Sequence, residues 1–467
     1  MKLHCPALER PSRLQVAQRQ RIVTTNPTPP FPPRRSTMRN LYLTTGFLLS
    51  FTLALGVAYS AEPATSSKEA GPIKFGPKDW PWWRGQTVNG FAAAGEKPPT
   101  KWSKTENVVW KVKTPGRGHA SPTVVGDRVY LPTADEGAET RSVLCFDRAT
   151  GEKIWERELH RGGMEKKGNK KSSQASSSIA CDGERLFVNF LHEGSMVTSA
   201  LGLDGKILWQ KKVIEFATHQ GFGSSPALYR HLLYVTADSK HGGLIAALDR
   251  STGEIVWKDG RPKQPNYASA VVLKVAGREQ VLISGCDLVA GYEPLTGRKL
   301  WEVEGSTTEC VTTMVTDGER VFVSGGYPKN HVQAIAADGS GKTAWENTAR
   351  VYVPSMLVRD GSLFAVQDGG VAMCWKSGTG EKLWEQRLGG TFSASLILVG
   401  DAIWATNEAG QTFIYEATPQ GYRAIAENKL GDEVFATPVV CGNRIYHRVA
   451  ELADGKRQEY LYCLGTK

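Results

Sequence analysis

Short runs rich in Val, Ile, Phe and Tyr follow one another from about residue 106 to the C-terminus, separated by turns that contain Gly and Asp. Residues 128–131 and 185–188 are typical runs, and each follows a turn, at 125–127 and 181–183. Gly tolerates positive φ and Asp can bond its own backbone, so both suit tight turns. The alternating β-branched and aromatic runs are typical of strands. The pattern predicts an all-β protein.

A glycine followed four residues later by a tryptophan recurs along this region. The fullest copies are FDRATGEKIW (146–155) and LDRSTGEIVW (248–257). A period of about forty to fifty residues, filled by four short strands, corresponds to one propeller blade. The tryptophans that end the phrase are Trp155, Trp209, Trp257, Trp301, Trp345 and Trp384.

The number of repeats predicts the number of blades and how the ring closes. The last repeat ends after its third strand, at 460–464, whereas the strand at 107–112, with Trp110, has no blade before it. We therefore expect an eight-bladed β-propeller of four-stranded blades over 106–467, closed by the N-terminal strand, which leaves no open sheet edge. The blades start near Ala120, Ala175, Gly223, Ala268, Cys310, Tyr352, Phe392 and Phe435.

The phrase Ala-x-Asp-x-x-Thr-Gly-x-x-x-Trp resembles the tryptophan-docking repeat of the quinoprotein dehydrogenase family and its PQQ-like relatives. Among those relatives is the periplasmic propeller of the outer-membrane protein assembly machinery. The resemblance covers roughly residues 106–467. It implies that Trp110 and the six repeat tryptophans have a structural role between adjacent blades, where a glycine leaves room for the neighbouring ring. Burying such a ring contributes on the order of a few kcal/mol.

The N-terminal part divides into three segments. Residues 1–37 are rich in Arg and Pro, and either they precede the true start at Met38 or they form a real extension. Residues 38–60 read as a signal peptide, because the apolar run 41–57 is followed by small residues before Ala61. The run is short for a membrane span. We expect an exported chain, periplasmic or extracellular, without a transmembrane span in its mature part.

Residues 61–105 are expected to form a tether and a Trp-rich strap. The cluster at 79–85, with Phe91 and Trp102, is interpreted as a strap on the outer face or rim of the propeller, and a sugar-stacking platform is the alternative. Seven cysteines remain beyond residue 60, without CxxC spacing. We interpret them as buried free thiols, and Cys441 with Cys463 is the first pair to test for a disulfide.

The basic character of the chain comes largely from its first sixty residues. The net charge of the whole chain is +10, and it falls to +3 without residues 1–60, which hold eight Lys or Arg and one acid. We therefore expect no nucleic-acid partner. The basic loop 166–171 is interpreted as a solvated loop, with an anion contact as the alternative.

The loops that enter the first strand of each blade are expected to crowd one mouth of the central channel, and ligand sites prefer such concave places. Small residues on these loops have a structural reason, since the inner strands converge there. Larger polar side chains exceed that need. The ligand-binding candidates are His119, Ser121, His219, Ser224, Asn266, Tyr267 and Glu309. We expect a monomer that takes a protein partner, a small ligand or a glycan at this mouth.

Quinone chemistry would need a hard cation with several oxygen ligands and a carboxylate base. The adjacent Cys pair that the resemblance implies is absent, and the axial loops carry few carboxylates. We assign no catalytic residue, no metal and no cofactor, and we favour an exported, non-catalytic propeller that binds or scaffolds through its channel mouth and blade faces. One alternative is a divergent oxidoreductase that uses PQQ and calcium. Another is a hydrolase or lyase that uses His119 or His219 with Glu309.

Overall fold

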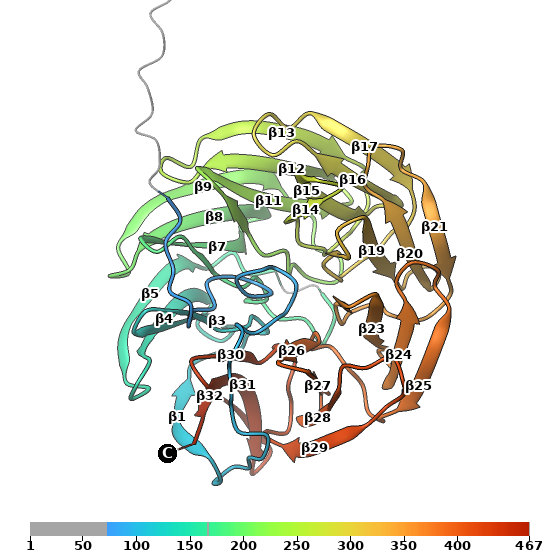
Figure 1. The fold of residues 1–467 in the computed structure, drawn as a ribbon. Coiled ribbons are helices and arrows are strands. Elements are labelled where there is room, and N and C mark those ends of the chain that lie inside the picture. Colours follow the sequence, from blue (N-terminus) through green and yellow to red (C-terminus); the bar gives the residue numbers. More distant parts are fainter. Residues whose placement is uncertain (1–71, 166–167, 467) are drawn as a thin grey trace, which may run out of the picture. The chain divides into compact units, whose positions relative to one another are not determined.

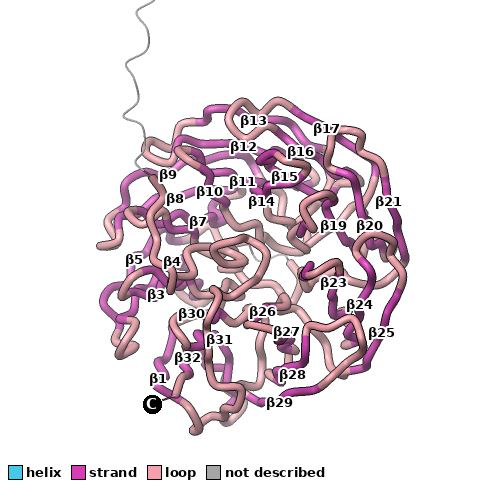
Figure 2. Tube along the Cα trace, in the orientation of Figure 1, coloured by secondary structure: helices cyan, strands magenta, loops and turns pink. Residues whose placement is uncertain are grey.

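Eight four-stranded sheets follow one another around a central axis and form a closed ring (Figure 1). The computed structural model describes residues 72–165 and 168–466. Its regular elements in these ranges are strands, joined by turns and loops (Figure 2). The expected all-β, eight-bladed propeller is confirmed. In the same ranges, no helix is long and apolar enough to cross a membrane. The expected extension 1–37, the signal peptide 38–60, residues 61–71 of the tether and residues 166–167 of the basic loop lie outside the described residues.

Each of the first four blades is an antiparallel meander that runs from the axis outward. Blade one is β2 (Thr123–Val125), β3 (Arg128–Asp135), β4 (Thr140–Asp147) and β5 (Lys153–Arg161). Blade two is β6 (Ala180–Cys181), β7 (Arg185–His192), β8 (Ser195–Gly202) and β9 (Ile207–Glu215). Blade three is β10 (Ala227–Tyr229), β11 (Leu232–Ser239), β12 (Gly242–Asp249) and β13 (Ile255–Arg261). Blade four is β14 (Val271–Val275), β15 (Arg278–Gly285), β16 (Leu288–Tyr292) and β17 (Lys299–Glu304).

The next three blades repeat this order, and the eighth takes its outer strand from the N-terminal side. Blade five is β18 (Val315–Thr316), β19 (Arg320–Gly325), β20 (His331–Ala336) and β21 (Thr343–Asn347). Blade six is β22 (Leu357–Arg359), β23 (Ser362–Val366), β24 (Val371–Lys376) and β25 (Lys382–Arg387). Blade seven is β26 (Ile397–Val399), β27 (Ala402–Thr406), β28 (Gln411–Glu416) and β29 (Ala424–Lys429). Blade eight is β30 (Val439–Cys441), β31 (Arg444–Ala453), β32 (Lys456–Leu464) and β1 (Val108–Thr114).

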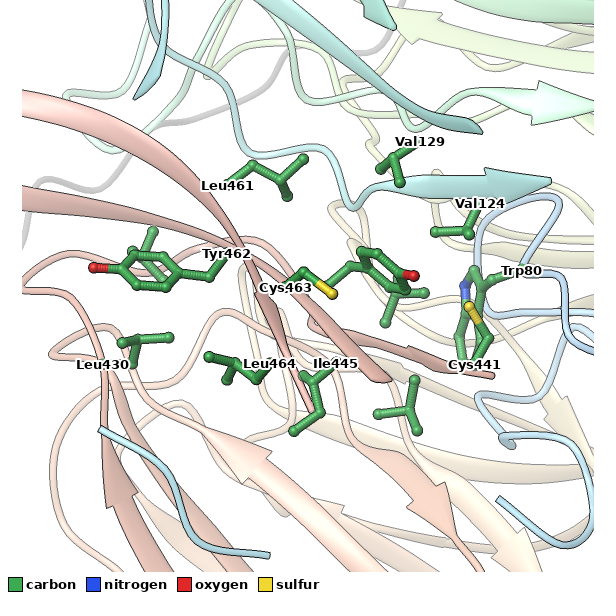
Figure 3. Packing of buried hydrophobic residues seen from close by; sticks show 14 of the residues in the cluster. Trp80, Val124, Val129, Leu430, Cys441, Ile445, Leu461, Tyr462, Cys463 and Leu464 are labelled. Carbon is green, nitrogen blue, oxygen red and sulfur yellow. The ribbon is translucent and has the colours of Figure 1, made fainter. Parts of the chain in front are cut away.

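The ring closes in blade eight as the repeat count predicts. Strand β1 pairs antiparallel with β32, with Lys111 opposite Tyr462, so the chain's first and last strands share one sheet. A buried apolar cluster fills the seam between this blade and its neighbours and includes Trp80, Val124 and Leu461 (Figure 3). Cys441 and Cys463 belong to the same cluster. The seven cysteines of the described residues are buried and unpaired, which agrees with their interpretation as free thiols.

Most of the repeat tryptophans dock on the next blade through one hydrogen bond. The indole Nε1 of Trp257, for example, donates to the Pro294 carbonyl at 2.8 Å, and a Cβ at Gly297 would lie 2.4 Å from the ring. Any larger residue than glycine would therefore displace the tryptophan. The same indole bond to a turn carbonyl of the next blade is made by Trp110, Trp155, Trp209, Trp345 and Trp384.

Trp301 behaves differently from the other repeat tryptophans. Its indole Nε1 donates at 2.7 Å to the Gln280 Oε1 of its own blade, and Val303 lies against Gly341 in its place. Gln280 is fully buried. A buried amide oxygen left without a donor is costly, and Trp301 supplies that donor. The Trp301 ring still packs in one buried cluster with Val321 and Val323 of blade five, so only its hydrogen-bond partner differs from the pattern.

Small hydroxyl residues at the start of the inner strands link the blades around the axis. The backbone N–H of Ser178, for example, donates to the Ser225 Oγ of the next blade at 2.9 Å. Each such bond satisfies a buried backbone donor that has no partner in its own sheet. This explains why small polar residues recur at these positions. The other bonds of the series are Ser121 to Ser178, Ser225 to Ser269, Thr313 to Ser355, Ser355 to Ser395 and Ser395 to Thr437.

The segment 74–102, which we call the strap, crosses one end of the channel (Figure 1). Trp80 forms a β-bridge with Val124 of blade one, and Phe91 forms one with Leu398 of blade seven. The Trp83 indole donates at 2.8 Å to Thr313, which leads into blade five, opposite blade one in an eight-membered ring. The strap therefore spans the axis. The sequence predicted a strap on the outer face or rim, and that prediction is wrong.

Arg84 fixes the strap at the centre of the ring. It is 2% exposed, and its guanidinium donates to the carbonyls of Leu396 at 2.9 Å and Met356 at 2.6 Å, which precede the inner strands of blades seven and six. Burial lowers the pKa of Arg84 to about 9. Trp80 and Trp102 are buried as well, so little of their ring surface is available for a sugar platform.

Candidate functional site

The strap closes one end of the channel, and a cavity of about 780 Å³ lies between it and the opposite mouth. We call this cavity the cup. Trp83 of the strap lines it together with residues from the entry loops of the blades. A volume of this size falls in the range of small-molecule sites. Four of the sequence-predicted candidates line the cup: His119, His219, Tyr267 and Glu309.

Glu309 is the most deeply set of these groups, with 4% of its surface exposed. Its backbone forms a β-bridge with Tyr327 on the β19–β20 loop, which holds the carboxylate against the cup. The Tyr352 hydroxyl donates to its Oε2 at 3.0 Å, and the His219 Nε2 lies 3.5 Å from its Oε1. The loops of blades three, five and six thus bring three polar side chains to one point.

Two tyrosines flank the Glu309 carboxylate. Burial, and then the negative charge of Glu309, raise the pKa values of Tyr267 and Tyr352, so both phenols stay protonated. The buried Tyr267 hydroxyl faces the Glu309 carboxylate and the backbone of Gln220. A Cβ at Gly326 would lie 2.3 Å from the Tyr352 side chain. Glycine at this position therefore allows the Tyr352 ring to reach Glu309.

His119 lies on the side of the cup next to the closing blade. Its ring stacks on Phe435 with 4.3 Å between ring centroids. Burial, and then the charges of Arg117, Arg448 and Arg457, lower its pKa well below 6.5, so the imidazole is neutral at neutral pH. The Nε2 atom is buried and has no hydrogen-bond partner among the residues that the structure describes.

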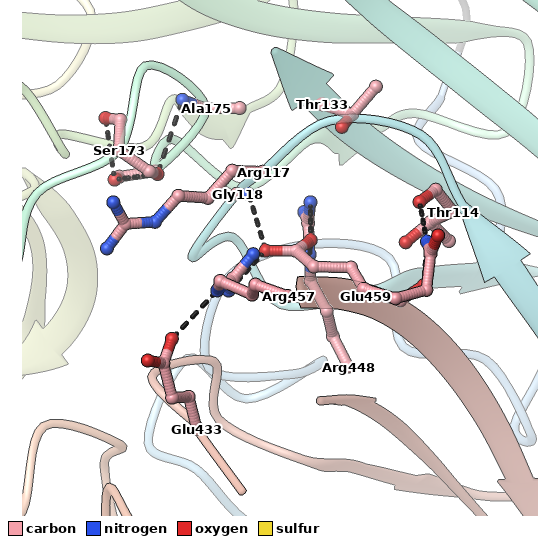
Figure 4. A network of polar contacts seen from close by, with 12 residues as sticks. Thr114, Arg117, Gly118, Thr133, Ser173, Ala175, Glu433, Arg448, Arg457 and Glu459 are labelled. Carbon is pink, nitrogen blue, oxygen red and sulfur yellow. Dashed lines mark hydrogen bonds and ion pairs between the residues drawn. The ribbon is translucent and has the colours of Figure 1, made fainter. Parts of the chain in front are cut away.

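A buried ion-pair network in blade eight positions the His119 loop (Figure 4). Glu459 is 1% exposed and accepts from the Gly118 backbone N–H at 3.1 Å. Arg448 donates to the same carboxylate at 2.6 Å and to the Pro132 carbonyl at 2.7 Å. Arg457 links Glu459 to Glu433 through contacts of 2.7 Å. Because these charges satisfy one another, the network supports the loop and does not face the cup as a free site.

Two further carboxylates line the cup, and each lies near a permanent cation. Glu408 accepts from Lys171 and from the Ser393 hydroxyl, both at 2.7 Å. Burial raises the pKa of Asp368, and the hydrogen bond from the Tyr352 backbone N–H and then the positive charge of Arg350 counteract that shift. Lys171 comes from the basic loop, so its ammonium meets a carboxylate of blade seven across the mouth.

Three sequence-predicted candidates do not line the cup. Ser121 and Ser224 are buried, and the Ser224 hydroxyl bonds Thr236 within its own blade. The Asn266 amide donates to Asp238 and to the Ser284 carbonyl, and its Oδ1 accepts from the Cys310 backbone N–H at 3.0 Å. These bonds occupy the Asn266 side chain, and they tie the loops of blades three, four and five together.

Sequence reasoning missed four residues that shape the cup, which are Trp83, Tyr352, Asp368 and Glu408. Tyr352 starts a blade on an entry loop, so its position was a usable signal. Trp83 was recognised only as part of the strap. Asp368 and Glu408 lie on loops between the second and third strands of blades six and seven. Only the arrangement of the loops at the mouth shows that they reach the cup.

The quinoprotein resemblance implies a quinone and a hard cation. The oxygen and nitrogen ligands that the described residues offer show whether the cation would fit. In the ranges 72–165 and 168–466, no group of three or more His, Cys, Asp or Glu side chains is placed to hold a metal ion. The three cup carboxylates, Glu309, Asp368 and Glu408, are each engaged by different neighbours. Calcium takes six to eight oxygen ligands. The residues present do not fit the implied cation site.

Comparisons with known proteins agree with this fold. The family model described as "Outer membrane protein assembly factor BamB" matches residues 91–213, 139–329 and 328–421. No curated protein matches the chain. Among solved structures, BamB from Moraxella catarrhalis is 15% identical with a TM-score of 0.54, and the match covers 76% of this chain and 99% of that one.

Quinoprotein structures share the fold to a similar degree. A europium-containing methanol dehydrogenase is 10% identical with a TM-score of 0.61, and the match covers 84% of this chain and 98% of that one. The quinohemoprotein alcohol dehydrogenase from Comamonas testosteroni is 13% identical with a TM-score of 0.60, and the match covers 84% and 81%. At these identities the likeness shows the fold alone. The family model spans most of the chain, so the protein belongs to the BamB family of PQQ-like β-propellers.

Proposed function

We propose that this protein is an exported, non-catalytic binding module that receives a ligand, or a segment of a protein partner, in the cup at the mouth of its channel. The observation that carries the proposal is the contrast within the cup. Its floor is closed by the strap, whereas its wall brings the polar side chains of Glu309, His219 and Tyr352 to one point. A few convergent polar groups in a concave pocket of this size are typical of a ligand site.

Export is part of the proposal because of the apolar run 41–57 and the small residues before Ala61. Membership of a family described as an outer membrane protein assembly factor supports an envelope location and a scaffolding role. We propose that the protein acts as a monomer, because the cup is formed by one chain. Light scattering on the purified protein tests the monomer directly.

The test of the binding function compares two tryptophan substitutions. Val353 lines the cup, so Val353→Trp fills it, whereas Val256 is 49% exposed on the outer strand β13, so Val256→Trp serves as the matched control. The original protein and both variants are titrated in thermal-shift assays with amines, neutral sugars and short peptides. A ligand at one hundred times its Kd stabilises by about 2.7 kcal/mol. We expect a saturable shift that Val353→Trp abolishes and Val256→Trp retains.

A parallel titration with PQQ and calcium addresses the oxidoreductase alternative. Saturable binding with a calcium-dependent absorbance change would contradict the non-catalytic proposal. A shift that is equal in both tryptophan variants would place binding outside the cup and would also contradict it.

A further inference from the structure

Glu309 differs from the other carboxylates of the cup in its counter-charge. Lys171 contacts Glu408 at 2.7 Å, and Arg350 lies near enough to Asp368 to oppose the rise of its pKa. Glu309 has as neighbours the neutral Tyr352 and Tyr267 hydroxyls and the His219 ring. A carboxylate that is 4% exposed therefore lines the cup without a permanent cation beside it. Burying a charge without such a partner is costly.

Aromatic rings surround the place that a counter-charge would occupy. Tyr267 and Tyr352 flank Glu309 and line the cup, and Tyr327, on the loop that pairs with Glu309, is 57% exposed at the lip. Trp83 forms part of the floor. Cations are attracted to the faces of tyrosine and tryptophan rings, most strongly where water is excluded. A carboxylate inside an aromatic frame is a combination that favours an organic cation.

Neutral or anionic ligands fit these groups less well. An anion would meet three carboxylates, and two of the cup's cations, Lys171 and Arg350, are already opposed to Glu408 and Asp368. A neutral ligand would bring no positive charge to Glu309. Electrostatic complementarity therefore selects a positive group.

We propose that the cup binds an organic cation, a primary amine or guanidinium, with its charged group against Glu309 and its alkyl stem against the rings of Tyr327 and Tyr352. This inference rests on the proposed binding function and names its ligand class. The cation can belong to a free small molecule or to a lysine or arginine side chain of a protein partner, since both present the same group.

The test is calorimetric titration of the full chain with three probes. These are cadaverine as a free amine, N-acetyl-lysine amide as a side-chain mimic, and N-acetyl-norleucine amide as the uncharged analogue that lacks the ammonium group. We expect the two amines to bind and the uncharged analogue to fail. Tighter binding of cadaverine would indicate a free small molecule as the natural ligand, and tighter binding of N-acetyl-lysine amide would indicate a side chain of a protein partner. In Glu309→Gln the affinity for both amines should fall about thirtyfold or more, because one partner of a buried charge pair is removed.

Control variants separate the charge of Glu309 from general damage. Glu346 and His331 form a similar pair, 3.1 Å apart, but Glu346 is 62% exposed on the outer strand β21, so Glu346→Gln should bind like the original protein. Tyr327→Ala removes an exposed ring at the lip and should weaken amine binding while the melting temperature stays unchanged. This second variant decides the question if Glu309→Gln fails to fold.

Three outcomes would overturn the inference: no amine binding up to millimolar concentration, equal binding of the uncharged analogue, or unchanged affinity in both Glu309→Gln and Tyr327→Ala. If a sugar or peptide still gave a shift that Val353→Trp abolishes, the cup would remain a binding site for a different ligand class. If no probe of any class gave such a shift, the binding function itself would fail together with the inference.

Discussion

The two ends of the channel are built by different means. At the strap end, backbone groups of the inner strands bond the strap directly, through the bridge at Val124 and the carbonyls that Arg84 holds. At the mouth, the blades contribute side chains from loops, such as His219, Tyr352 and Glu309. The strap end is held mainly by bonds to backbone groups, and the mouth carries polar side chains that can contact a ligand.

This difference explains how one propeller fold can host different functions. Contacts to backbone carbonyls depend little on which side chains the inner strands carry, so the strap end can stay the same while the mouth changes. Loop side chains such as His219, Tyr352 and Glu309 are not needed to build any sheet. Function therefore belongs to the loops and stability to the strands and the strap. The predictions below test that division.

The largest effect is expected from Arg84→Met at the strap end. The change leaves the carbonyls of Leu396, Met356 and Asn89 without the guanidinium that bonds them. Each lost bond costs about 1–2 kcal/mol, and relief from burying the charge offsets part of the sum. We expect the free energy of unfolding to fall by about 3 kcal/mol, measured by chemical denaturation.

The control for this prediction is Arg387→Met. Arg387 ends the outer strand β25 and is exposed, so its substitution should change the free energy of unfolding by less than about 0.5 kcal/mol. If Arg84→Met were as mild as Arg387→Met, the strap would not be part of the stable fold and the contrast between the two ends would disappear.

The repeat made the fold predictable because each copy specifies its own turn and strand from residues close together in the sequence. The Gly and Trp of one phrase predict a turn and an outer strand, and the unpaired strand at Trp110 predicts where the ring closes, which β1 and β32 confirm. Trp301 keeps its place between two blades, but its indole N–H bonds the buried Gln280 of its own blade where the other repeat tryptophans bond a turn carbonyl of the next blade.

The cup was less predictable because its residues do not repeat. Glu309 and His219 could be singled out as oversized polar residues on entry loops, but their contact could not be predicted. Glu408 and Lys171 are 237 residues apart and meet only because the ring closes. Trp83 reaches the cup because the strap crosses the axis, and nothing periodic in the sequence specifies that path.

The next prediction concerns how stability depends on pH. Blade eight contains a buried histidine, His447, on strand β31. His447 is 1% exposed, neither ring nitrogen has a hydrogen-bond partner among the described residues, and burial lowers its pKa from 6.5 to about 4. The folded protein thus keeps it neutral where the unfolded chain would protonate it. Its contribution to stability is full above pH 6.5 and is lost as the pH falls toward 4.

Acidification from pH 7 to pH 5 should therefore lower the free energy of unfolding by about 2 kcal/mol through His447 alone. The free energy of unfolding, measured by chemical denaturation at each pH, should depend less steeply on pH in His447→Phe. His241→Phe removes an exposed histidine and should leave the slope unchanged. An equally steep slope in His447→Phe would mean that the acid sensitivity arises elsewhere, for example at the buried His119 of the mouth.

The smallest effect is expected at the contact of Lys171 with Glu408 across the mouth. Lys171 is 58% exposed and Glu408 16% exposed, so water screens the pair on one side. A double-mutant cycle with Lys171→Ala and Glu408→Gln should give a coupling energy of about 0.5 kcal/mol, which decreases at high salt. Glutamine can still accept the Ser393 hydroxyl that bonds Glu408, so the cycle isolates the charge.

The pair formed by Lys382 and Glu385 on β25 serves as the reference, since its side chains are 51% and 53% exposed and lie far from the cup in blade six. Equal coupling in the two pairs would show that the mouth is held no more firmly than an outer blade edge. A coupling above about 2 kcal/mol at Lys171 would instead make this contact part of the fold. The mouth would then be rigid like the strap end, and a ligand would have to break a structural bond to enter.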